Sequence, residues 1–141
     1  MPFDGQKTTL DLSREAFVKA DPRTRLAMLA AALRRPLPSH FAWDFGRLHC
    51  CAIGLAQEMW GSAFARADGE KAAMDAFGLS SLAVDMLFFD VVLYGVAFFG
   101  DVRPRMVADM IDVYLEEGED GLRKAEQRAK RKVESDANRS A

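Results

Sequence analysis

The chain has 141 residues and a mass of 15.6 kDa; half of its residues are apolar and 28% are charged. These values are those of one globular domain with its own core, and they exclude a disordered chain or a scaffold that needs metal or disulfide cross-links. The 19 basic and 21 acidic residues leave a net charge of −2, which excludes a strong field over the whole molecule. Any charged binding site must therefore be local.

The most apolar segment does not fit a membrane span. Residues 82–99 contain Asp85 and Asp90, and an aspartate near the centre of a bilayer costs about 2.5 kcal/mol or more. The N-terminal residues 1–12 also lack the charged-then-apolar pattern of a secretory signal. The sequence therefore predicts a cytoplasmic protein that does not span a membrane and that begins with a flexible arm over residues 1–12.

Helical signals run through the first third of the chain. A short helix is expected from Ser13, and Asp21 followed by Pro22 is typical of the start of the next one, because aspartate caps free amides and proline fits the first helical position. Leucine and alanine then recur at three- and four-residue spacing until Pro36 ends the helix.

The middle of the chain combines an aromatic linker with another long helix. Three large rings occupy the linker at residues 36–45, namely Phe41, Trp43 and Phe45. Because so many rings do not suit a segment surrounded by water, we expect the linker to pack against the core. Residues 47–60 predict a helix, in which Gly54 indicates that another backbone passes close by.

Two shorter helices are expected next. Residues 70–77 predict a helix that Gly78 closes, and Ser80 or Ser81 caps the following one. This helix leads into a run that is apolar on every side, and the last part of the run, residues 91–99, fits a strand as well as a helix. We favour a helix followed by a loop.

A two-part C-terminal region completes the fold. Arg103 and Pro104 open an amphipathic helix, residues 118–121 break it, and residues 122–133 form a basic helix before a disordered end. The predicted fold is all-α, a single compact domain of about five to six helices. Its parts are a flexible N-terminal arm (1–12), a helical core (13–117) and a charged C-terminal helix with its disordered tail (118–141).

Cys50 and Cys51 are the candidates for reactive thiols. They follow His49, and an imidazole beside a thiolate is a common arrangement in cysteine nucleophiles. Neighbouring residues on a helix diverge, however, so His49 faces neither thiol, and the same divergence argues against a zinc site shared with His40. We expect reduced cysteines that pack at a tight helix crossing, with no metal and no cofactor.

Asp85 and Asp90 are two acids in the most apolar part of the sequence. Burial raises the pKa of a carboxyl group, so either residue is a candidate general acid or base. Either also suits a structural role, as the cap of a turn or as the ion-pair partner of an arginine such as Arg103. We favour the structural role, because structural ion pairs are commoner than catalytic acids.

Two sets of residues are candidates for binding a partner. The basic set, which suits the phosphates of DNA or RNA, comprises Arg123, Lys124, Arg128, Lys130, Arg131 and Lys132. The apolar set, which suits an adaptable protein-binding surface, comprises Met86, Phe89, Phe98 and Phe99. Salt bridges to the preceding acids are the alternative for the first set, and burial in the core is the alternative for the second.

Several short motifs resemble a loose group of small uncharacterised bacterial and phage helical proteins. The motifs are Trp43-Asp44-Phe45, Cys51-Ala52-Ile53-Gly54, Phe77-Gly78-Leu79, Leu87-Phe88 and Arg103-Pro104. In that group a Cys-x-x-Gly helix precedes a Gly-Leu turn and a final helix that starts with proline. Members often carry a further cysteine a few residues upstream, where this chain has the adjacent Cys50. The resemblance implies a helical fold in a bacterial cytoplasm and no particular activity.

These observations favour a non-enzymatic interaction or regulatory protein that presents a helical, apolar surface to a protein partner or to a second copy of itself. The first alternative is a nucleic-acid-binding protein that uses its basic C-terminal helix. The second alternative is a small enzyme that depends on Cys50 or Cys51.

Overall fold

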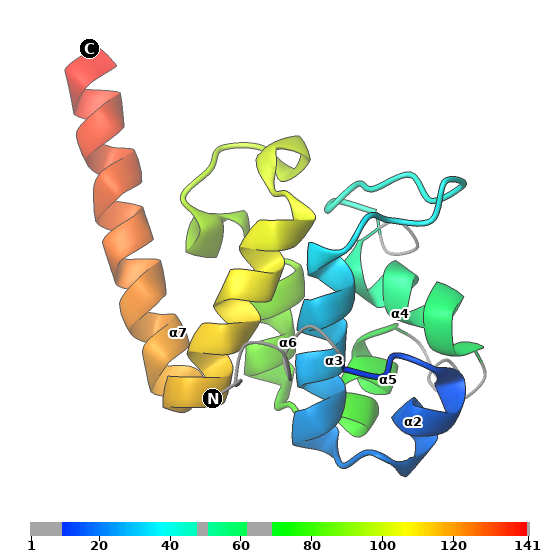
Figure 1. Cartoon of the computed structure of the whole chain (residues 1–141). Helices are drawn as coiled ribbons and strands as arrows, with labels where there is room; N and C mark the ends of the chain where they lie inside the picture. The colour runs from blue at the N-terminus through cyan, green and yellow to red at the C-terminus, as the bar shows by residue number, and fades with distance from the viewer. Residues whose placement is uncertain (1–9, 48–50, 62–68, 141) are drawn as a thin grey trace, which may run out of the picture.

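The structure is a computed structural model that describes residues 10–47, 51–61 and 69–140. Within these residues the chain forms six α-helices, two 3₁₀-helices and no β-strand. In chain order they are α2 (Arg14–Lys19), α3 (Pro22–Arg34), α4 (Ala52–Trp60), α5 (Gly69–Phe77), α6 (Ser81–Phe88), η3 (Val91–Tyr94), η4 (Phe99–Asp101) and α7 (Pro104–Ser140). They enclose one core (Figure 1), which confirms the prediction of a single all-α domain of about five to six helices.

Three predicted helix starts are confirmed by their caps. The side chains of Ser13, Asp21 and Ser80 each accept a hydrogen bond from the amide three residues further on, at 3.1, 2.7 and 3.1 Å. These bonds satisfy first-turn amides that have no partner inside the helix. The helices α2, α3 and α6 therefore begin where the sequence predicts.

The helix predicted over residues 47–60 is shorter in the structure. It begins as α4 at Ala52, and the preceding Cys51 has an extended backbone with φ −104° and ψ −165°. Upstream, Asp44 accepts a hydrogen bond from the amide of Gly46 at 3.0 Å. Such a side-chain bond stabilises a turn just before the predicted start, and residues 48–50 of the predicted helix lie outside the described residues.

The aromatic linker packs against the core as expected. Phe45 is buried, and its ring contacts those of Tyr94 and Phe99, with centroids 5.5 and 6.1 Å away. Trp43 is half-buried, and its indole N–H donates to the carbonyl of Val102 at 2.7 Å. These contacts fix the linker against the chain that leads into α7.

Helix α3 lies between the two halves of the bundle. It packs against α4 and α5 on one side and against α7 on the other (Figure 1). Its leucines Leu26, Leu29 and Leu33 are buried, as their spacing predicts. The chain before α2 also belongs to the body of the protein, because the indole N–H of Trp60 donates to the carbonyl of Leu12 at 3.0 Å.

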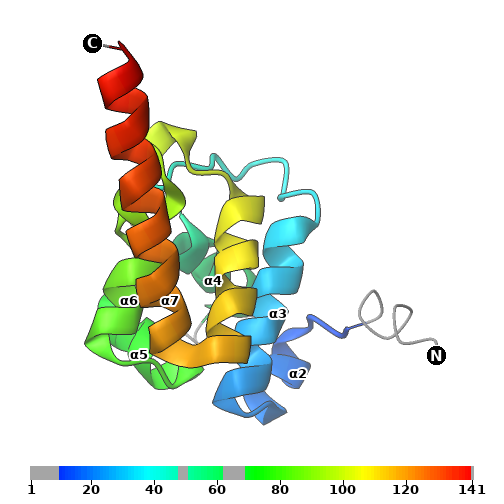
Figure 2. The same ribbon diagram turned by 90° about the vertical axis from the view of Figure 1, so that its left-hand side faces the viewer.

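Helix α7 is bent back on itself at Gly118. This residue has φ 69° and ψ −159°, a conformation that is open essentially to glycine alone, and it confirms the predicted break. Residues 104–117 are the first arm of α7, and residues 119–140 are its second arm. From the turn the two arms diverge, and the second arm projects beyond the rest of the molecule (Figures 1 and 2).

The second arm is longer than the basic helix that the sequence predicts. We expected a helix to Val133 and a disordered end, whereas the backbone is helical through Ser140, and Ala141 lies outside the described residues. A helix that has already formed extends readily, because each added residue gains a hydrogen bond without a new nucleation step. The base of the arm also belongs to the core, since Leu122 and Ala125 are buried.

Candidate functional site

Contacts along one side of the second arm determine which of its faces points outward. Leu122 and Ala125 are buried, and Ala129 lies against Gly95, where an added Cβ would be 3.7 Å from the Cβ of Ala129. Residues at three- and four-residue spacing share one side of a helix. This inner side therefore holds the base of the arm against α6 and η3 and leaves the other sides to solvent.

The outer face of the second arm, turned away from the body, is basic. It carries Lys124, Arg128 and Arg131, all of which are exposed; Lys132 is also exposed, but it follows Ala125 and Ala129 at helical spacing and so lies on the inner side of the projecting part of the arm. Among the described residues, none of these four side chains forms an ion pair with a carboxylate. Like charges at three- and four-residue spacing destabilise a helix by roughly 0.2–0.5 kcal/mol per pair. The arm therefore retains a cluster of like charges that an anionic partner would neutralise.

The other two members of the predicted basic set lie on a different side of the arm. Arg123 pairs within the arm with Glu119 at 3.9 Å and with Asp120 at 3.5 Å. Lys130 is two helical turns further on and shares the side of Arg123. The six basic residues are thus divided between the outer face, the flank and, for Lys132, the inner side, and among them only Arg123 forms ion pairs within the described residues.

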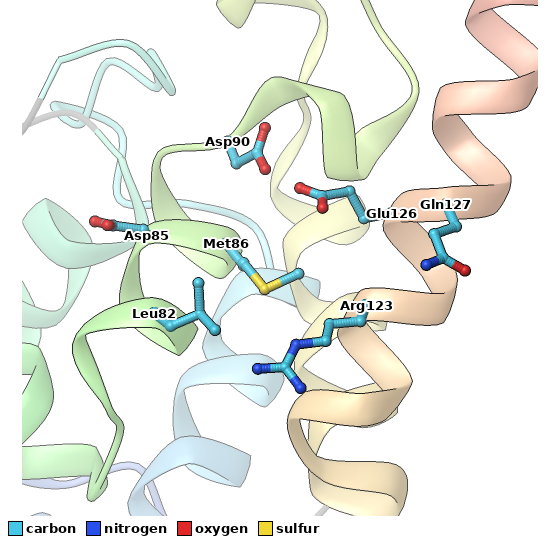
Figure 3. A pocket seen from close by; sticks show the side chains of 7 residues that line it. All are labelled: Leu82, Asp85, Met86, Asp90, Arg123, Glu126 and Gln127. Atoms are coloured by element: carbon cyan, nitrogen blue, oxygen red, sulfur yellow. The ribbon is translucent and has the colours of Figure 1, made fainter.

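A cleft of about 360 Å³ lies between the second arm and α6 (Figure 3). Its floor is apolar and consists of Leu82 and Met86. Met86 is only 4% exposed, so it lines the bottom of the cleft and offers a partner little surface, and its role in an interaction stays a prediction. Leu82 is 43% exposed at the mouth of the cleft.

Two carboxyl groups face each other at one end of the cleft. Figure 3 shows Asp90 and Glu126 directed toward one another, whereas Asp85 turns away from the arm. The hydrogen bond with Asp90 raises the pKa of Glu126 to about 7; partial burial and the negative charge of Asp90 act in the same direction, and Lys130 acts against them. The pair is therefore close to the midpoint of its titration at neutral pH.

The structural role that we favoured for Asp90 is confirmed. Its carboxylate caps η3 by accepting a hydrogen bond from the amide of Val92 at 2.9 Å. Asp85, by contrast, is exposed. Sequence reasoning missed Glu126 as the partner of Asp90, and the only signal for it was its position as the single acid within the basic stretch.

The predicted thiol site receives no support from the described residues. Cys51 is 1% exposed at the start of α4, so a substrate has no direct route to its sulfur, and His49 and Cys50 lie outside the described residues. His40 contacts Glu58 at 3.0 Å instead of a thiol. In the described ranges no three His, Cys, Asp or Glu side chains are grouped to hold a metal ion.

The remaining apolar candidates lie at the surface. Phe98 is 72% exposed, Phe99 is 47% exposed and Phe89, at the end of α6, is 36% exposed. Phe99 is partly covered because its ring stacks on Phe45. These three phenylalanines therefore stay candidates for contact with a partner.

Two further findings bear on the function of the chain. None of the helices within the described ranges combines the length and the hydrophobicity that crossing a bilayer requires. A comparison of the chain with protein-family models, with curated proteins and with solved structures finds no match. The function is therefore inferred from the surfaces of the molecule itself.

Proposed function

We propose that this protein acts by binding and not by catalysis, and that the outer basic face of the second arm binds the phosphate backbone of a nucleic acid. The observation that supports this proposal is the row of three exposed cations without ion-pair partners among the described residues: Lys124, Arg128 and Arg131. A cation that contacts a phosphate releases counterions from the nucleic acid, and this release supplies most of the sequence-independent affinity.

The shape and composition of the arm favour a duplex as the partner. A helix with its side chains is about 10–12 Å across, and the major groove of B-DNA is about 12 Å wide. The end of the arm projects from the body (Figure 1), and every residue from 130 to 136 is exposed. Residues 119–140 contain no aromatic side chain, whereas proteins that bind single strands rely on stacking against aromatic rings.

Fluorescence anisotropy with a labelled DNA duplex, recorded over a series of salt concentrations, tests the proposal. The test variant is Lys124→Gln, Arg128→Gln and Arg131→Gln combined, and the control is Lys19→Gln, Arg47→Gln and Arg105→Gln, which removes the same charge from other exposed positions. We expect the test variant to lose roughly tenfold or more in affinity, and its salt slope to fall by about 0.9 for each lost phosphate contact. The control is expected to change both quantities much less.

Three outcomes would contradict the proposal. The first is a wild-type affinity that does not respond to salt, and the second is a test variant that binds as well as the control. The third is preferential binding to vesicles of anionic lipid over the duplex at equal concentrations of phosphate, which would assign the basic face to a membrane surface instead.

Interaction with a protein is a second candidate function, and a different observation favours it. Large apolar side chains are exposed along α6, along the second arm and before α7, namely Leu82, Phe89, Phe98 and Val133. Large exposed apolar side chains mark an interaction site when they form a continuous patch. The mass of the protein in solution, alone and after incubation with a bacterial cytoplasmic extract, tests this role, and a strictly monomeric protein would contradict self-association.

A further inference from the structure

The flank of the second arm that faces the cleft carries charges of alternating sign. In chain order they are Arg123, Glu126, Lys130 and Glu134, which share one side of the helix at three- and four-residue spacing. Glu126 is half-buried and the other three are exposed. Within the described residues no ion pair joins Lys130 to either glutamate, although the four-residue spacing permits one.

When a second copy of the arm runs in the opposite direction, its charges are opposite in sign to those of the first arm at each facing position. If two second arms lie antiparallel with Lys130 of one copy opposite Glu126 of the other, the same register places Arg123 opposite Glu134, because both pairs are centred near residue 128. Two-fold symmetry repeats each contact, so every charge on the flank meets an opposite charge. A parallel arrangement would oppose like charges at every position, and it is therefore disfavoured.

The same register brings exposed apolar side chains together. Val133 is 37% exposed and lies four residues after Ala129, so it continues the inner line of the arm. In the antiparallel arrangement Val133 of one copy lies near residues 123–124 of the other, beside the cleft floor formed by Leu82 and Met86. Covering Leu82 and Val133 removes apolar surface from water and favours association.

The projecting part of the arm has little tertiary support in a single copy. Every residue from 130 to 136 is exposed. Short helical segments without packing are only marginally stable in water, so a neighbouring helix would stabilise this part. The whole arm is about 33 Å long at 1.5 Å per residue, which gives two antiparallel arms an extended line of contact.

We propose that two copies of this chain pair through their second arms in antiparallel register, so that the projecting end of each arm covers the cleft beside α6 of the other copy. The pairing uses the flank and the cleft, and it leaves Lys124, Arg128 and Arg131 exposed. Nucleic-acid binding through the outer face and pairing through the flank are therefore separate properties of one helix.

Sedimentation velocity of the full chain and of two charge-reversal variants tests the pairing. The wild-type protein is expected to be a dimer. Glu126→Lys alone and Lys130→Glu alone each create two like-charge contacts per dimer, and we expect each to raise the dimer dissociation constant by roughly tenfold or more. An equimolar mixture of the two variants is expected to form a heterodimer, because each reversed charge then meets an opposite charge in the other copy.

The mixing experiment distinguishes contacts between copies from effects within one helix. Each variant still carries its altered arm in the mixture, so an effect within that arm would persist, whereas a lost contact between copies would be restored. Lys19→Glu, an exposed charge reversal on α2, is the control and is expected to remain dimeric, and circular dichroism verifies that all variants are folded. A monomeric wild type, single variants that remain dimeric, or a mixture that stays monomeric would each overturn the proposal. A wild type that binds a duplex as a monomer would overturn the pairing and leave the proposed nucleic-acid binding intact.

Discussion

The two arms of α7 belong to one helical element and yet are held in different ways. In the first arm Val107, Ala108 and Ile111 are fully buried, and Arg34 of α3 forms ion pairs with the exposed side of the arm. In the second arm burial ends after the first three turns, and every residue from 130 to 136 is exposed. Gly118 separates the arm that is buried along one side from the arm that is mostly exposed.

This difference separates structural residues from residues that are available to a partner. The first arm buries its apolar side within the chain, and two of its acids, Asp109 and Asp112, pair with Arg34, so these features are explained by stability. The second arm keeps exposed like charges on its outer face and exposed alternating charges on its flank, which add little to the stability of a single copy. Residues that do not stabilise the fold are those for which a binding role is the better explanation.

The largest expected effect comes from truncating the buried side of the first arm. Ile111→Ala removes a fully buried side chain, and we expect it to lower the free energy of unfolding by about 2–5 kcal/mol. Val133→Ala on the second arm is the matched truncation at an exposed position, and its effect is expected to stay within about 0.5 kcal/mol. Urea unfolding of both variants measures the difference at a protein concentration where the chain is monomeric. Similar decreases in the free energy of unfolding for the two variants would contradict the conclusion that the core holds the first arm but not the end of the second arm.

The sequence predicts the first arm well because its signals are local. Pro104 marks the start, the apolar stripe has helical spacing, and Gly118 marks the end. The caps at Ser13, Asp21 and Ser80 are local in the same sense. Elements that are fixed by neighbours along the chain can therefore be read from the sequence alone.

Features that depend on contacts between distant segments could not be predicted in this way. Met86 has the composition of a binding surface but lies in the core, because the position of the second arm decides which side of α6 is covered. The meeting of Asp90 and Glu126 likewise depends on the angle of the turn at Gly118. Helical spacing indicates which residues share a face, whereas packing decides what that face meets.

The turn between the arms provides the next largest effect. Gly118→Ala forces a side chain into φ 69° and ψ −159°, and such strain costs about 1–3 kcal/mol. No atom lies within 4 Å of the position that the new Cβ would take, so the expected loss is due to backbone conformation alone. Gly100→Ala is the control, because its Cβ position is equally open and its φ does not lie in the positive region. Equal thermal unfolding of both variants would show that the turn does not require glycine.

The ion pairs of Arg34 are expected to have a smaller effect. Arg34→Gln removes contacts of 2.8 and 2.6 Å to Asp109 and Asp112, and because these groups are partly exposed we expect a loss of about 0.5–1 kcal/mol. Arg123→Gln on the second arm removes longer contacts within one helix and is expected to cost about 0.3–0.5 kcal/mol. Both losses should shrink in high salt, and a salt-independent loss for Arg34→Gln would assign its effect to packing instead.

The smallest effect concerns the carboxyl pair that joins the second arm to η3. The pKa of Glu126 is raised from its ordinary 4.5 to about 7 by its hydrogen bond with Asp90, so this contact contributes stability that is fully present below about pH 4.5 and is lost as the pH rises through about 7. Glu126→Gln keeps a donor for Asp90 without titrating. We expect this variant to lack the loss of protection from hydrogen exchange that the wild-type amides near residues 125–130 show between about pH 4.5 and 7, the window set by these two pKa values.

The same titration connects the cleft with the proposed pairing of the arms. In a dilute solution of single copies, NMR of the Glu126 carboxyl group is expected to show a midpoint near 7, because Asp90 raises its pKa more than Lys130 of the same copy lowers it. When two copies pair, the ammonium group of Lys130 from the second copy approaches Glu126 and lowers this pKa, since an opposite charge favours the ionised form. The midpoint should therefore fall as the protein concentration rises. A dilute midpoint near 4.5 would show that the two carboxyl groups do not share a proton, whereas a midpoint near 7 at every concentration would show that no second lysine reaches the cleft.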